Sequence, residues 1–137
     1  EIDPKKNVIA ISADHQSALF SEAASASFHA DGWQVYSLGD MSSSIDVLFD
    51  LDLQKFLTKV WKSGTGIMVI VIFSSTEESM KFFAESVNSI KLKSRRSLYL
   101  AICGDMKKNT EIKADLIDED LEAILQWSQT TFESSIS

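Results

Sequence analysis

An apolar segment in the middle of the chain restricts the folds that this sequence can adopt. Residues 66–73 are GIMVIVIF, rich in Val and Ile and without a polar side chain. The segment is far shorter than the roughly 20 apolar residues that cross a bilayer as a helix. A strand with apolar side chains on both faces must be covered on both, which is typical of a parallel sheet. We therefore predict a buried strand here.

Strand-like and helix-like segments alternate along the rest of the chain. The predicted strands are residues 7–12, 33–38, 66–73, 97–103 and 114–117, and the predicted helices are residues 16–31, 45–63, 76–91 and 118 onward. Strands joined by helices form parallel βαβ crossovers, which put helices on both faces of the sheet. We expect an α/β fold, a flavodoxin-like or Rossmann-like, doubly wound, five-stranded parallel sheet.

The helix ends carry characteristic residues. Ser75 and Glu78 have the spacing of a capping box, and Asp118 is expected to cap the last helix. Gly32 and Gly64 are expected to end the first two helices. Apolar side chains at helical spacing predict the buried faces of these two helices: Leu19, Phe20, Ala23, Ala24 and Phe28 in the first, and Val47, Leu48, Leu51, Phe56, Leu57, Val60 and Trp61 in the second.

Length and composition indicate one domain, residues 1–137, which we expect to be excised from a larger regulatory protein. The chain has 137 residues, of which 45% are hydrophobic and 24% are charged, as in ordinary globular domains. The net charge of −7 argues against a nucleic-acid surface. With no export signal and a single cysteine, Cys103, we expect a cytoplasmic protein without a membrane segment.

Ligands of doubly wound sheets bind outside the carboxyl ends of the strands. In this chain the loops that follow these ends are residues 13–18, 39–44, 74–76 and 104–107. The candidate cofactor-binding residues in these loops are His15, Gly39, Ser74, Ser75, Thr76 and Gly104. Neutral imidazole is a common metal ligand, so His15 is also a candidate axial ligand. Cys103 is a second candidate ligand, or alternatively a small buried apolar residue. Ser74 and Ser75 are alternatively helix caps.

The element order and several short motifs resemble the cobalamin-binding domains of mutases, methyltransferases and light-responsive regulators. Residues 32–39, GWQVYSLG, look like the second-strand signature of glycine, aromatic, x, Val, x, x, Leu, Gly. Residues 73–76, FSST, resemble the Ser/Thr segment after the third strand, and residues 113–115, KAD, resemble a late Gly-Ala-Asp. The resemblance covers nearly the whole chain.

The first loop departs from that family. There it is Asp-x-His-x-x-Gly, in which His is the lower axial ligand of cobalt, Asp orients it and Gly leaves room for the nucleotide tail. The resemblance assigns the ligand role to His15, whereas Ala13 and Ala18 stand at the Asp and Gly positions. Loss of the partner of a ligating His commonly weakens metal binding 10- to 100-fold. Cys103 and Gly104 replace the family's Gly-Gly, which is expected to narrow the tail slot.

A subset of the family, the haem-binding sensor modules of photosynthesis regulators, is similar but holds haem. Haem lacks the nucleotide tail, so a narrowed slot matters less, and His15 or Cys103 could approach the iron. The chain is thus expected to be a degenerate member that resembles these modules. Haem is favoured over cobalamin, and a domain without any cofactor is the third alternative.

The sequence predicts a binding function and no catalysis. It contains no paired acid and base, no nucleophile beside a His and no Gly-rich phosphate loop. We expect a sensory or regulatory domain that acts through a protein partner in signal transduction or transcription control. One alternative is a binding-only pseudo-receiver, since receivers share this element order. Phe73, Ser74 and Ser75 stand where the phosphoacceptor Asp of a receiver would fall, which excludes a phosphorylated one. The other is a cobalamin-carrying domain of a methyltransferase or mutase.

Overall fold

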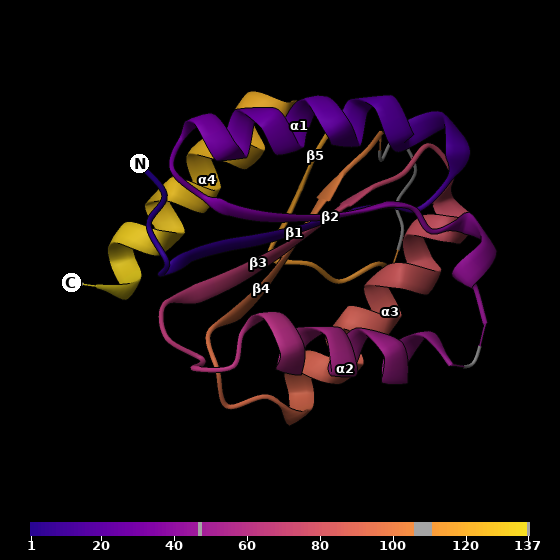
Figure 1. The fold of residues 1–137 in the computed structure, drawn as a ribbon. Coiled ribbons are helices and arrows are strands. Elements are labelled where there is room, and N and C mark those ends of the chain that lie inside the picture. Colours follow the sequence, from indigo (N-terminus) through magenta and orange to yellow (C-terminus); the bar gives the residue numbers. More distant parts are fainter. Residues whose placement is uncertain (47, 106–110, 137) are drawn as a thin grey trace.

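A five-stranded, all-parallel sheet with the order β2-β1-β3-β4-β5 forms the centre of the molecule. The structure is a computed structural model that describes residues 1–46, 48–105 and 111–136. The strands are β1 (Lys6–Ser12), β2 (Gln34–Asp40), β3 (Ile67–Phe73), β4 (Leu98–Cys103) and β5 (Leu116–Asp118). The helices are α1 (Ala18–Ala30), α2 (Phe49–Val60), α3 (Glu77–Lys93) and α4 (Leu121–Ser135), with short 3₁₀ turns η1 (His15–Ser17) and η2 (Ser42–Ser44). Helices α1 and α4 cover one face, and α2 and α3 cover the other (Figure 1). The predicted doubly wound fold is confirmed.

Strand β3, at the middle of this sheet, is the strand that was predicted to be buried on both faces. All seven of its residues are fully buried, and it pairs with both β1 and β4. Its side chains alternate between the two cores, since Ile70 and Ile72 belong to the α2–α3 side and Val71 and Phe73 to the α1–α4 side. Each such side chain contributes about 1.5–3 kcal/mol through burial. One segment therefore anchors both helical layers.

The helix boundaries differ from the expected ones by one to four residues. The N-cap of α3 is Thr76, whose hydroxyl accepts a hydrogen bond from the Ser79 N–H, so the predicted capping box at Ser75 is wrong. Asp120, and not Asp118, caps α4. Both of these caps have the extended backbone angles that are typical of a capping residue. Helix α2 begins only at Phe49, because η2 precedes it.

Several apolar residues that were predicted to be buried are exposed. Leu19 is 79% exposed, and Phe20, Leu48 and Leu51 are also exposed. Turn η1 delays the start of α1, so its buried stripe is instead Ser17, Ser21, Ala24 and Phe28. The prediction for Val47 lies outside the described residues. The carboxyl-edge ends of α1 and α2 therefore present apolar side chains to solvent.

Helix α4 should be an integral part of the fold, because Ile124 is fully buried against the sheet. Ile124→Ala is expected to lower the free energy of unfolding by about 2–4 kcal/mol. The matched change at half-buried Leu121 should cost less, about 1–2 kcal/mol, because its site is already partly solvated. Urea denaturation measures both, and a near-zero loss for Ile124→Ala would make α4 peripheral.

Candidate functional site

The ends of β1 and β3 lie side by side at the carboxyl edge, where the chain leaves for opposite faces. After β1 it enters α1 on one face, and after β3 it enters α3 on the other. Such a divergence creates the crevice in which doubly wound domains bind ligands. Backbone bonds hold the loops together here, from the Met41 N–H to the Ser12 carbonyl and from the Ala13 N–H to the Phe73 carbonyl, both at 2.8 Å.

His15 stands at this edge in the turn η1, and its side chain is 93% exposed. Its Nδ1 lies 3.3 Å from Oδ2 of Asp40, the last residue of β2. A carboxylate can only accept, so the tautomer with hydrogen on Nδ1 makes this bond and leaves a free lone pair on Nε2. In the part of the chain that the structure describes, Nε2 has no protein partner. The arrangement matches that of a metal-ligating His oriented by a carboxylate.

Asp40 is the residue that sequence reasoning missed. The family pattern directs attention to position 13, whereas the carboxylate comes from the neighbouring strand. Gly39, with φ of +70°, adopts a conformation that favours glycine, at a bulge where the register of β1 and β2 shifts. Hydrogen bonds from Ser42, and then the contact with His15, hold the pKa of the Asp40 carboxyl below its ordinary value of 3.8. Asp40 is therefore an anion at neutral pH.

Asp14 bridges the crevice between β1 and β3. Its Oδ1 accepts hydrogen bonds from the Ser17 N–H at 3.0 Å and the Ser17 hydroxyl at 2.9 Å. Its Oδ2 accepts from the Ser75 N–H at 2.7 Å and lies 3.4 Å from the hydroxyls of Ser74 and Ser79. Burial alone would raise the pKa of this carboxyl, but the hydrogen bonds from Ser75 and Ser17 together lower it. An anionic side chain thus ties the two loops together.

The three hydroxyl candidates after β3 bond within the protein. The Ser74 hydroxyl donates to the Thr76 carbonyl at 2.8 Å, and the Ser75 hydroxyl donates to Gln16 Oε1 at 3.1 Å. The Thr76 hydroxyl caps α3. These residues therefore organise the loop around Asp14, and only Ser75 and Thr76 are exposed.

Cys103 is buried, and Gly104 beside it is partly exposed. Burial, and after it the charges of Asp118 and Asp120, raises the pKa of the Cys103 thiol to about 12. The thiolate is the form that binds metals, so this buried thiol packs as a small apolar group. A Cβ at Gly104 would meet the Ser74 carbonyl oxygen at 2.8 Å, so only glycine fits. The remainder of that predicted loop, residues 106–107, lies outside the described residues.

Two aromatic side chains pack against each other on the α1–α4 side of this edge. Phe73 ends β3, which runs between β1 and β4, and is fully buried. Phe20 of α1 packs edge-on against it, with ring centroids 5.5 Å apart. The described residues therefore offer one exposed imidazole, that of His15, as a ligand for a tetrapyrrole metal, and a partly exposed aromatic ring over the end of β3.

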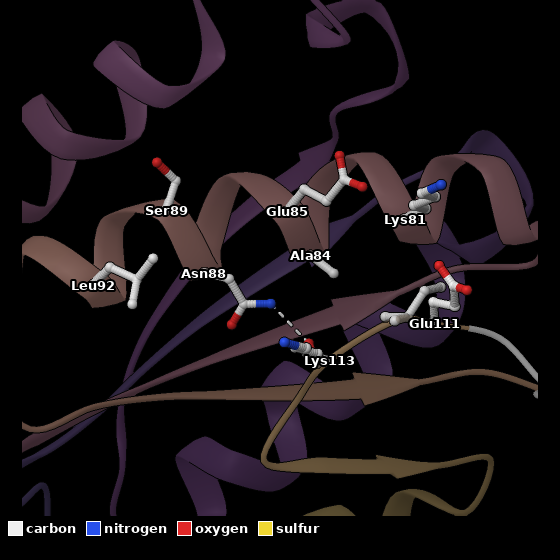
Figure 2. Close-up of a pocket in the computed structure, with 9 residues that line it drawn as sticks. Lys81, Ala84, Glu85, Asn88, Ser89, Leu92, Glu111 and Lys113 are labelled. Atoms are coloured by element: carbon white, nitrogen blue, oxygen red, sulfur yellow. Dashed lines mark hydrogen bonds between the residues drawn. The ribbon is translucent and has the colours of Figure 1, made fainter.

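Two open cavities lie on the α3 side of the molecule. One of about 520 Å³ lies at the edge beside Asp14, and Ser42 and Phe82 also line it. Figure 2 shows the other, a groove of about 400 Å³ along α3, in which the Asn88 side chain donates to the Lys113 carbonyl at 2.8 Å. His15 lines neither cavity. Residues 1–46, 48–105 and 111–136 contain no cluster of three metal-ligating side chains and no helix able to cross a membrane.

Comparison with solved structures identifies a similar fold in the monomethylamine corrinoid protein of Methanosarcina barkeri. The two chains superpose with a TM-score of 0.68 and 17% sequence identity, over 92% of this chain and 57% of the other. This chain thus spans little more than half of that protein's length. No protein-family model and no curated protein matches the sequence. The domain is a flavodoxin-like α/β domain of the kind seen in a corrinoid protein.

Asp14 should stabilise the fold in a pH-dependent manner. Asp14→Asn is expected to lower the free energy of unfolding by about 1–2 kcal/mol at pH 7, because it removes a partly screened, charge-assisted cap and bridge. Since the pKa is depressed in the folded state, the stabilisation is complete above the ordinary value of 3.8 and is lost as the pH falls through the lower folded-state value. Urea unfolding between pH 7 and pH 2 measures this.

The control variant is Glu22→Gln, which changes an exposed carboxylate on α1. It should alter stability by less than about 0.5 kcal/mol at every pH. If the difference in the free energy of unfolding between the wild type and Asp14→Asn stays constant down to pH 2, the bridge does not depend on an ionised Asp14.

Proposed function

We propose that this chain is a non-catalytic binding module for a metal tetrapyrrole, haem or a corrinoid, at the carboxyl edge of its sheet. His15 Nε2 would bind the metal, and Asp40 would orient the imidazole. The module acts as a regulatory domain through contact with a protein partner. The bound metal would supply ligand or redox sensing, while the protein supplies the ligand and the surface around it.

The exposed His15–Asp40 pair is the observation that carries this proposal. A ligating His normally donates its second nitrogen to a carboxylate or carbonyl, which fixes the ring and raises its basicity. Asp40 meets that requirement at 3.3 Å from Nδ1, although Ala13 replaces the family's Asp. The similar fold of a corrinoid protein supports the choice of a tetrapyrrole.

The apolar side chains near the edge support a role in binding both a macrocycle and a partner. Leu19 and Phe20 are exposed in the first turn of α1, and Ile45 and Leu48 are exposed just before α2. A macrocycle is a flat apolar surface, and exposed apolar groups near a ligand site are typical of binding regions. The described residues offer no acid–base pair with a reacting position between them, so we assign no reaction to the domain.

The test is a visible absorption titration with haemin and with diaquacobinamide, both of which have an open axial position. Wild-type protein should give a spectral change typical of imidazole coordination, and His15→Ala should lose it. Asp40→Asn should weaken binding about 10- to 100-fold, because the ring loses its anionic partner.

His29→Ala is the matched control, since His29 is the other histidine and lies exposed at the far end of α1. It should bind like the wild type. If neither tetrapyrrole depends on His15, the proposal fails, and a partner-binding module without a cofactor takes its place.

A corrinoid carrier in a methyltransferase is the second candidate, which the similarity to the Methanosarcina barkeri protein favours. A carrier must bind complete cobalamin with its nucleotide tail displaced from cobalt. Hydroxocobalamin coordinated by His15 at an affinity equal to that of cobinamide would favour this candidate over the regulatory one.

A further inference from the structure

We infer that the amino edge of the sheet, on its α2–α3 side, docks an acidic segment of a protein partner. The inference deepens the proposed function, because it names the surface and the charge of the partner through which the module would act, and it rests on that function only for the existence of a partner. This surface lies at the end of the sheet opposite to His15, and it involves no tetrapyrrole.

The positive charge of the chain is concentrated in two segments. Residues 53–65 contain three Lys and no Asp or Glu, and residues 86–104 contain two Lys and two Arg and again no Asp or Glu. The two segments thus hold seven of the 13 basic residues. Since the whole chain has a net charge of −7 and these segments carry +7, the rest of the chain carries −14.

The fold brings these two segments together. Helices that connect parallel strands run antiparallel to them, so α2 and α3 both end at the amino edge of the sheet (Figure 1). Arg96, which follows α3, joins the segments, because its Nη1 donates to the Trp61 carbonyl at 2.8 Å and its guanidinium lies 5.3 Å from the centre of a Trp61 ring. The exposed cations of the two helix ends and of the residues that follow form the basic patch, which consists of Lys59, Lys62, Lys93, Arg95 and Arg96.

The basic patch is not neutralised within residues 1–46, 48–105 and 111–136. The ion pairs there are His15–Asp40 and Lys91–Asp115, and neither includes a member of the patch. Lys59 and Lys93 lie in the last turns of their helices, where a cation stabilises the helix dipole. Lys62 and Arg95 lie beyond the helix ends, where that effect falls off. Their charge is therefore available to attract an acidic partner.

A groove of about 260 Å³ lies in the basic patch between α2 and α3. Its polar rim includes Thr58, Lys93 and Arg96, and its buried lining is apolar, formed by Leu57, Trp61, Ile90 and Leu98. The volume is below the roughly 300 Å³ at which small-molecule sites begin, so the groove fits one side chain of a docked segment. An acidic segment with an apolar residue matches both the rim and the lining. Nucleic acid matches less well, because the rest of the chain, at −14, repels its phosphates.

The test is a fluorescence anisotropy titration of the whole chain with a labelled peptide of Glu-Glu-Leu repeats. The wild type should bind this peptide at low salt and more weakly at physiological salt, where the Debye length falls to about 8 Å. The double variant Lys62→Gln/Arg95→Gln should bind about 2- to 30-fold more weakly at low salt, the loss expected for two exposed ion pairs. The matched control Lys81→Gln/Lys113→Gln removes two exposed lysines outside the basic patch and should bind like the wild type.

Equal affinities of the two double variants for the peptide would overturn the inference, provided that circular dichroism gives both a wild-type melting profile. Tighter binding of a single-stranded oligonucleotide of the same net charge, lost in Lys62→Gln/Arg95→Gln, would also overturn it and make the basic patch a nucleic-acid site. A peptide with Ser in place of Leu should bind more weakly, and an unchanged affinity would contradict the docking of a side chain in the groove.

The outcome is separable from that of the tetrapyrrole titration. No tetrapyrrole is present, so failure of the peptide to bind leaves metal coordination by His15 intact. Conversely, a lack of His15-dependent spectra with haemin and cobinamide would refute the tetrapyrrole part of the proposed function while peptide binding to the basic patch remained.

Discussion

Burial of β3 on both faces is the constraint on which the rest of the structure depends. Because its alternate side chains pack into two separate cores, a helical layer is needed on each face of the sheet. With the strand order β2-β1-β3-β4-β5, the chain leaves β1 and β3 for opposite faces, which creates a crevice between their ends. The candidate site thus lies next to the strand on which both cores are built.

Two ionised carboxylates, those of Asp14 and Asp40, organise the loops at the carboxyl edge of the sheet. Asp14 faces inward and joins the loops that would otherwise part, while Asp40 lies at the end of β2 and holds the imidazole of His15. Hydrogen bonds lower the pKa of both carboxyls, so each is an anion under ordinary conditions. One ties the loops after β1 and β3 together, and the other holds the exposed imidazole.

The sequence predicted the sheet, the helical layers and the edge at which His15 lies, since these follow from hydrophobic period and chain direction. It did not predict the exposure of Leu19 and Leu48, because the 3₁₀ turns that shift the start of each helix have no clear signal. The bonds of Asp14 and Asp40 depend on which strands are neighbours and on a bulge. Those are properties of the assembled sheet and not of any local segment.

The contact between His15 and the Asp40 carboxylate depends on the number of residues in β2, because this strand contains a bulge. Ala10 pairs with Ser37 and Ile11 pairs with Gly39, so Leu38 is an extra residue in the ladder. After this extra residue the ladder resumes, with Ile11 opposite Gly39 and Ser12 opposite Asp40. The length of β2 therefore decides which of its side chains stands beside the end of β1, where the carboxylate of Asp40 meets the imidazole of His15.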